Sequence, residues 1–280
     1  MTGANLTREQ LSHRIVRSLA LARERTATAD LLNFYADLCE FQQSFLPQQS
    51  HVLRPSPRTF ADALDASAAA TIAIELVRWL DDRPQQGLTN VTRTLLHRPK
   101  HEWEPLLDRY WRAAGVSLTD IEEADQFVAE ALLQPFAESL VRSRERESPH
   151  GDDGTERGAH AGSRCRICGG QAFLATLRER GHGAKRSLMC GFCLAEWPAP
   201  RVTCPQCGED KHDALLVYRA EEFPEVRIDA CRNCHSYLKT IDLTRNGIAI
   251  PVVDDLASVA LDLWAAGRGY RKLRPNLLRL

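Results

Sequence analysis

Four short Cys-x-x-Cys turns constrain the fold of this chain more than any other feature. They hold eight of its nine cysteines within about a quarter of the sequence, namely Cys165, Cys168, Cys190, Cys193, Cys204, Cys207, Cys231 and Cys234. A turn of this kind directs two sulfur atoms toward one point, so four turns supply the ligands of two tetrahedral metal sites. Because four thiolates leave no open position for metal-assisted hydrolysis, the pattern predicts metal ions that build structure or move an electron.

The spacing of the turns favours ligation by successive pairs. The first two turns are separated by 21 residues and the last two by 23, a weak internal repeat that indicates two small ribbon modules. Successive pairing closes two local hairpins, whereas a cross-braced arrangement would interleave the four turns. Disulfides and a thioredoxin-type redox pair are the alternatives to metal, but four copies of a redox motif would be unusual.

The metal itself is left open by the residues, because four thiolates suit zinc and a mononuclear iron equally well. Each module is too small to fold on its own core, so the metal ion is expected to stabilise it. Gly169, Gly191 and Gly208 follow or lie inside the turns, where a positive φ angle is often needed. His235 follows the last turn, but four sulfur atoms already complete the site, so we interpret it as a surface residue.

Residues 1–142 are predicted to form a helical bundle domain of about six helices. Apolar residues recur at helical spacing from residue 8 onward, with further helices at about 28–46, 59–82, 86–97, 102–114 and 119–140. Cys39 falls on the apolar face of its helix, which indicates a small core residue rather than a nucleophile. Residues 143–163 are charged and glycine-rich with almost no large apolar side chain, a composition that predicts a flexible linker.

The fold class predicted beyond the linker completes an α+β protein. Short apolar runs between the turns predict strands, in a first tetrathiolate module at 164–200 and a second at 201–280. The run DDLASVALDLWAAGRGY predicts an amphipathic helix near the end of the second module. The expected architecture is therefore an all-α N-terminal domain, two small tandem zinc-ribbon or rubredoxin-like modules, and a C-terminal helix.

Composition argues against several classes of protein. The chain has no run of about 18 apolar residues that would predict a transmembrane helix, and its N-terminus does not read as a signal peptide. We therefore expect the reducing cytosol, where paired cysteines bind metal more often than they form structural disulfides. Residues 164–280 carry an excess of five positive charges, which two filled sites would reduce to about one. No phosphate loop, nucleophile elbow or open metal motif is present, so no enzyme activity is predicted.

The residues around the four turns resemble a known family. The segments RCRICGG, LMCGFCLAEWPAPRVTCPQCGE, ACRNCHSYLKTID and DDLASVALDLWAAGRGYRKLRPN are similar to the formate dehydrogenase accessory (assembly) protein family, FdhE. The segment LLNFYADLCEFQQSFL is similar to the helical domain of that family. The resemblance covers nearly the whole chain and is strongest from Arg164 to Gly269.

The resemblance implies a function as well as a fold. It implies a cytoplasmic accessory protein or chaperone, not an enzyme, whose two rubredoxin-like modules bind iron. The implied partner is the catalytic subunit of a respiratory formate dehydrogenase, which is assembled before export. The eight cysteines are the metal ligands in this resemblance, and a partner-binding surface is carried over to Glu196, Trp197, Arg201, Tyr237, Lys239 and Asp242.

Two other functions stay open from the sequence. Tandem zinc ribbons often bind nucleic acid, but the near-neutral charge of the metal-filled half and its scattered basic residues argue against this, so no nucleic-acid partner is expected. A rubredoxin-type electron-transfer protein would require iron rather than zinc in the sites.

Overall fold

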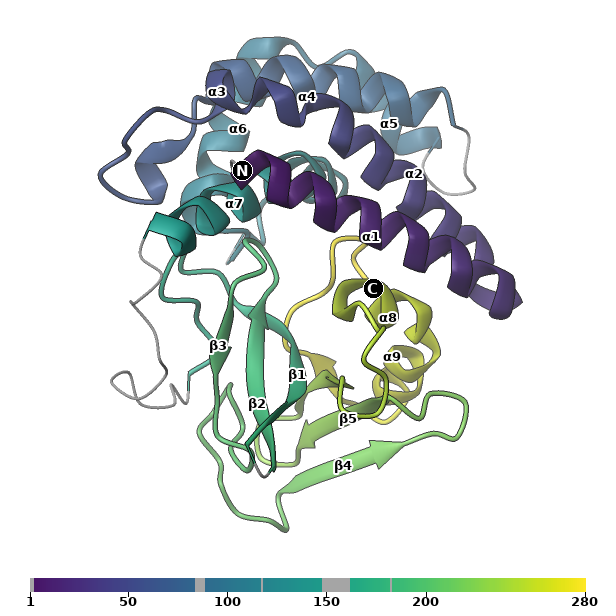
Figure 1. Cartoon of the computed structure of the whole chain (residues 1–280). Coiled ribbons are helices and arrows are strands. Elements are labelled where there is room, and N and C mark those ends of the chain that lie inside the picture. The colour runs from purple at the N-terminus through teal and green to yellow at the C-terminus, as the bar shows by residue number, and fades with distance from the viewer. Residues whose placement is uncertain (1–2, 84–88, 117, 148–161, 182) are drawn as a thin grey trace.

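The chain folds as a layer of helices packed over one end of a twisted sheet (Figure 1). The structure is a computed structural model that describes residues 3–83, 89–116, 118–147, 162–181 and 183–280. The helices of the N-terminal half are α1 (Gly3–Glu24), α2 (Ala29–Phe45), α3 (Gln49–Val52), α4 (Ala66–Asp81), α5 (Thr89–Leu96), α6 (Lys100–Ala113) and α7 (Glu123–Glu147). This half confirms the predicted helical domain.

Helix α4 shows how local sequence fixes a helix boundary. Its buried alanines let neighbouring helices approach closely. The helix begins at Ala66, not near residue 59 as predicted, because the Asp65 carboxylate accepts a hydrogen bond from the Ala68 amide at 3.0 Å. Such a cap satisfies an amide that the first turn of a helix leaves without a partner. The residues just before the cap form a short 3-10 turn instead.

Helix α2 places Cys39 in the middle of the helical core, where the side chain is fully buried. This confirms its interpretation as a core residue. Burial raises the pKa of the Cys39 thiol to about 12, so it is protonated at neutral pH. Among the described helices, none is both long and apolar enough to cross a membrane.

The described strands form one sheet, which carries both of the predicted ribbon modules. They are β1 (Ala172–Arg180), β2 (Gly183–Cys190), β3 (Glu196–Pro198), β4 (Leu215–Arg219), β5 (Val226–Cys231), β6 (Ser236–Asp242) and β7 (Arg271–Lys272). The strand order is β3-β2-β1-β6-β5-β4, with β7 beside β6. Each ribbon is antiparallel, as expected, but β1 and β6 pair in parallel from Leu174 opposite Lys239 to Leu177 opposite Asp242. This pairing joins the two ribbons edge to edge.

The two ribbons contribute to different cores. Cys190 and Phe192 of the first ribbon belong to the main core of the helical half, together with Val253 of helix α8 (Pro251–Ala257). The second ribbon has a smaller core of its own, in which Ile228 packs near Leu261 of helix α9 (Val259–Ala266). The first ribbon is therefore built into the helical half, whereas the second packs mainly on the C-terminal helices.

Helix α1 and the residue that follows it also form ion pairs with helix α8 and with the segment before β5. Arg17 donates to the Asp254 carboxylate from Nε at 3.1 Å, and Arg25 donates to Glu225 at 3.2 Å. The Arg25 guanidinium also lies over the Phe223 ring, 4.6 Å from its centroid. These contacts hold the N-terminal helix against the sheet half.

Two predicted boundaries differ from the structure. Helix α7 continues to Glu147, five residues into the predicted linker, and residues 148–161 of that linker lie outside the described residues. The predicted C-terminal helix is interrupted at Ser258. The Lys239 ammonium donates to the Asp255 carbonyl at 2.6 Å, and an oxygen engaged in this way is drawn out of the helical ladder.

Candidate metal centres

The eight cysteines converge in two groups of four, each formed by successive turns. Each cysteine offers one sulfur, and the sulfur atoms of a group all lie within 4.8 Å of one another. In the first group, the Sγ atoms of Cys165 and Cys193 are 3.7 Å apart and those of Cys168 and Cys190 are 3.5 Å apart. In the second group, the Sγ atoms of Cys204 and Cys234 are 3.7 Å apart, as are those of Cys207 and Cys231. The structure thus has the successive grouping that the spacing favours.

These distances fit a single tetrahedral ion. Zinc–sulfur bonds of about 2.3 Å place the sulfur atoms of a regular tetrahedron about 3.8 Å apart. None of the nine cysteines, all of which lie in the described ranges, forms a disulfide. When bound, an ion of this kind would cross-link two hairpins, and iron would add a one-electron redox couple.

The four turns share one backbone conformation, which explains how the sulfur atoms are aimed. The residue after the second cysteine of each turn has a positive φ angle: +80° at Gly169, +58° at Leu194, +78° at Gly208 and +54° at His235. Amides inside the turns point at sulfur, as from Ile167 to Cys165 Sγ at 3.4 Å. His235 is exposed, and its position reflects this turn conformation.

Gly191 does not follow that pattern, and glycine occupies this position for a different reason. Its φ angle is not positive, contrary to the sequence expectation. A Cβ atom there would lie 2.5 Å from Nε and 2.6 Å from Cδ of Arg274. Glycine is therefore required because a buried arginine passes directly over the second turn.

The helical half holds the first site from outside. Phe192, inside the second turn, makes edge-to-face contacts with Tyr110 and Trp111, with ring centroids 5.9 and 5.6 Å apart. The Gln134 side chain of helix α7 donates to the Gly191 carbonyl at 3.0 Å. Aromatic packing of this kind and a hydrogen bond between buried groups fix the turn onto helices α6 and α7.

Arg274 connects the same turn to a buried polar network. Its guanidinium donates to Glu130 at 2.9 Å and to the Ala114 carbonyl at 2.8 Å, and Tyr110 also donates to Glu130. Although burial opposes it, Glu130, Tyr110 and the Cys190 sulfur together raise the pKa of Arg274. The fixed positive charge beside Cys190 would stabilise the negative charge of a filled four-thiolate site.

The second site is more open. Cys207 is exposed and Cys234 is partly exposed, while all four cysteines of the first site are buried apart from the partly buried Cys168. Cys204 and Cys231 line a cavity of about 130 Å³. Inside the fourth turn, the Asn233 side chain lies 3.7 Å from Cys207 Sγ.

Without metal, the thiols of each group compete for protons. In the first group, hydrogen bonds among the cysteines push the pKa of Cys165 well below its ordinary value and that of Cys168 well above it. In the second group, burial raises the pKa of Cys204. Burial also acts on Cys234, but hydrogen bonds from Ser236 and from other cysteines lower its pKa to about 7. A bound cation would remove this competition, because it requires all four as thiolates.

Three of the residues expected on a partner-binding surface lie near the first ribbon edge and the second site. Glu196 accepts hydrogen bonds from Thr176 at 2.9 Å and Arg178 at 2.8 Å. Trp197 is partly buried against the main core. Arg201 is exposed, and it has no interaction partner within the described residues. Arg201 is thus the member of this trio that is free to meet another molecule.

The other three residues expected on a partner-binding surface are buried in this structure. Lys239 is fully buried, Tyr237 is 4% exposed and Asp242 is 6% exposed. The Asp242 carboxylate caps the turn that follows β6 by accepting from the Thr244 hydroxyl at 2.6 Å. These side chains serve the fold, because burial excludes them from direct contact with a partner in this conformation.

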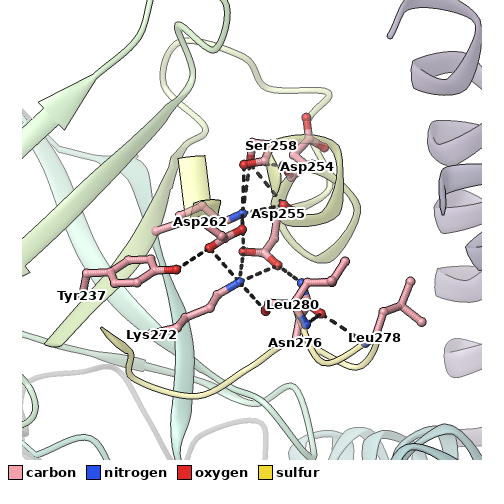
Figure 2. A network of polar contacts seen from close by, with 10 residues as sticks. Tyr237, Asp254, Asp255, Ser258, Asp262, Lys272, Asn276, Leu278 and Leu280 are labelled. Atoms are coloured by element: carbon pink, nitrogen blue, oxygen red, sulfur yellow. Dashed lines mark hydrogen bonds and ion pairs between the residues drawn. The ribbon is translucent and has the colours of Figure 1, made fainter. Parts of the chain in front are cut away.

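Tyr237 and Lys239 belong to a network of buried charges beneath the second ribbon. Figure 2 shows Tyr237, Asp255, Asp262 and Lys272 of this network. The Lys239 ammonium lies 3.0 Å from the Asp255 carboxylate and 2.5 Å from that of Asp262. Lys272 contacts both carboxylates at 3.1 Å, and the Tyr237 hydroxyl donates to Asp262 at 2.9 Å. Two ammonium groups thus face two carboxylates, so the buried charges are paired as their desolvation requires.

Sequence reasoning missed the residues that act around the first site. Glu130, Gln134 and Arg274 lie far from the cysteine turns in the chain, and each is buried. Glu130 and Gln134 sit four residues apart in the middle of helix α7, so they share one face. A glutamate and a glutamine amid a long apolar helical stretch were the available signal, since such residues are rarely buried without a partner.

The fold and the sites define an α+β protein in which a helical domain packs on a sheet that carries two closed four-cysteine sites. The model of the family described as FdhE, C-terminal domain, matches residues 202–279. A Protein FdhE homolog of Pseudomonas aeruginosa is 29% identical over 97% of this chain and 90% of that protein. The crystal structure of the FdhE protein from Pseudomonas aeruginosa matches with a TM-score of 0.67 and 25% identity, covering 97% of this chain and 96% of that chain. The chain is thus similar to FdhE proteins over nearly its whole length, in sequence and in fold.

Other relatives match a shorter segment. A Protein FdhE homolog of Aquifex aeolicus is 37% identical over 41% of this chain, and one of Pseudomonas putida is 38% identical over 41% of it. The chain spans 41% and 38% of the lengths of these two relatives.

Proposed function

We propose that this protein is an accessory protein for the assembly or maturation of a respiratory formate dehydrogenase. It would bind the catalytic subunit in the cytoplasm before export, without being an enzyme itself. The observation that carries the proposal is the similarity to an FdhE protein along 97% of the chain, in both sequence and fold. The closed four-thiolate sites support it, because they build a rigid surface and offer no position for substrate activation.

The proposed partner face surrounds the second site. Arg201 is free there, and the apolar side chains of Val202 and Val217 are 40% and 53% exposed. All three line the cavity against Cys204 and Cys231. Exposed apolar side chains around a hollow, with one unpaired cation at the rim, are the composition that protein interfaces favour.

Deletion of the gene in the native host tests this function. We expect respiratory formate oxidation to be lost while the catalytic polypeptide is still synthesised. Complementation with Arg201→Glu should restore less activity than complementation with Arg109→Glu, which alters an exposed arginine on the helical half. Normal formate oxidation in the deletion strain would contradict the proposal.

Iron is proposed as the native metal on the family resemblance, with zinc as the alternative. The exposure of Cys207 in the second site is the observation that favours a rubredoxin-type electron-transfer role. Metal analysis of the protein purified from its own host distinguishes iron from zinc in the two sites. Zinc in both sites would remove electron transfer and leave the accessory role standing.

A further inference from the structure

The two metal sites have the same ligands but unequal access from solution. Of the first site, Cys165, Cys190 and Cys193 are buried. Of the second, Cys207 is exposed, and a cavity reaches two further ligands. A closed four-thiolate site releases its ion when an incoming ligand reaches the ion and a cysteine sulfur dissociates from it. Access therefore governs how readily each site exchanges its ion.

The first site is also locked by contacts from distant parts of the chain. Its second turn cannot open unless Phe192 leaves the aromatic cluster of Tyr110 and Trp111. Opening also breaks the hydrogen bond from Gln134 to Gly191 and displaces the turn from beneath Arg274. Such an opening is a large part of global unfolding, and its free energy approaches that of the whole fold.

Within the described residues, the second site lacks this aromatic packing onto the helices, and its contact from a distant buried side chain is the hydrogen bond from Arg186 to the Thr203 carbonyl at 3.2 Å. The turn from Cys204 to Cys207 is closed by its own backbone, as from the Gly208 amide to the Cys204 carbonyl at 2.9 Å. The side chain of Gln206 meets Gln171 at 3.1 Å in an exposed contact. Contacts of this kind open locally at small cost, because solvent replaces what is lost.

We infer that the first site keeps its metal as part of the core, whereas the second site exchanges its metal with ligands in solution. In each exchange step, one cysteine sulfur loses its bond to the ion and takes a proton from solvent. A nitrogen, oxygen or sulfur donor of the incoming chelating ligand takes its place on the ion. The oxidation state of the ion does not change. This goes beyond the proposed accessory function and does not depend on which protein is the client.

Timed chelation of the zinc-loaded full chain tests the inference. The protein is mixed with excess 4-(2-pyridylazo)resorcinol, which reports released zinc by colour, and samples are pulsed with N-ethylmaleimide and mapped by peptide mass spectrometry. We expect two release phases of one equivalent each. Labelling of Cys204, Cys207, Cys231 and Cys234 should follow the fast phase, and labelling of the other four ligands should follow the slow one. Cys39 reports unfolding of the helical core and should label no earlier than the slow phase.

Two matched variants test the lock. Gln134→Leu removes the hydrogen bond to Gly191, while Gln42→Leu removes a comparable bond from a buried glutamine to the Ala131 carbonyl at 2.7 Å, away from the eight ligand cysteines. Loss of a group that supports metal ligands typically costs roughly 10–100-fold in metal affinity. We therefore expect Gln134→Leu to accelerate the slow phase by about tenfold or more relative to Gln42→Leu.

Three results would overturn the inference. They are a single release phase for both metals in the unmodified chain, labelling of the first four cysteines ahead of the second four, or equal acceleration by the two glutamine variants. The first two need no variant, so the test does not depend on either variant folding. Formate dehydrogenase activity is not measured, so a failure here would leave the proposed function untouched.

Discussion

The two four-cysteine sites have almost the same cysteine spacing in the sequence, but their surroundings in the fold differ. The first is enclosed by helices α6 and α7 and by the segment that carries Arg274. The second is formed by the neighbouring ribbon, with Cys207 exposed and a cavity beside it. The comparison teaches that a ligand motif fixes the coordination of a metal, whereas distant parts of the chain decide whether the site is a core element or an accessible one.

Removing two ligands of one site or of the other is the strongest test of this comparison. We expect Cys190→Ser combined with Cys193→Ser to abolish the cooperative unfolding of the whole chain. Structural zinc sites contribute about 10–16 kcal/mol, which matches or exceeds the total stability of most domains. The same pair of changes at Cys231 and Cys234 should leave helical unfolding cooperative. Circular dichroism during thermal unfolding is the measurement, and equal loss of helix in both variants would contradict the comparison.

The stability of the second ribbon depends on its buried charges, whereas that of the first depends on packing against the helical core. Asp255→Asn leaves Lys239 and Lys272 to share one carboxylate, that of Asp262. Because breaking a buried charge pair is strongly destabilising, we expect the free energy of unfolding to fall by about 3–5 kcal/mol. Denaturant titration measures the change.

An exposed pair provides the control for that variant. Asp120→Asn breaks the contact of Asp120 with Arg109, in which both side chains are more than half exposed. We expect no measurable loss of stability, because solvent screens such pairs. A loss as large as that of Asp255→Asn would show that burial is not what gives the network its importance.

A single methyl group can test how tightly the second turn is held. Gly191→Ala places a Cβ atom against Arg274, and overpacking of this kind typically costs about 1–3 kcal/mol. Gly183→Ala is the matched control, because nothing lies within 4 Å of its Cβ position. Thermal unfolding of both variants should show a lowered midpoint for the first alone. If Gly191→Ala behaves like its control, the close approach of Arg274 does not restrain the turn.

Acid should weaken the second ribbon slightly through Asp255. Although burial opposes it, Lys239 and Lys272 hold the pKa of Asp255 below its ordinary value of 3.8. Because the folded-state pKa is the lower one, the stabilisation is present above the unfolded pKa and is lost as pH falls through the folded pKa. We expect the unmodified chain to lose stability more steeply than Asp255→Asn from about pH 5 to 3. Parallel slopes in denaturant titrations would contradict the assignment.

The sequence predicted what depends on neighbours along the chain. The eight cysteines, their grouping in successive turns and the helical character of the first half follow from local spacing, and the structure agrees with each. The pairing of β1 with β6 could not be foreseen, because it joins segments about 65 residues apart through ordinary strand residues. For the same reason, the sequence placed Lys239 on a partner-binding surface. Its ammonium group instead pairs with the carboxylates of Asp255 and Asp262, which lie further along the chain.

Hydrogen exchange tests the central claim most directly, namely that the first site alone belongs to the core of the helical half. The zinc-loaded chain would be compared by mass spectrometry with Cys165→Ser/Cys168→Ser and with Cys204→Ser/Cys207→Ser. The account predicts that the first double variant loses amide protection in α6 and α7, whereas the second loses it around β4 and β5 alone. Equal loss of protection in α6 and α7 in both variants, or in neither, would contradict it.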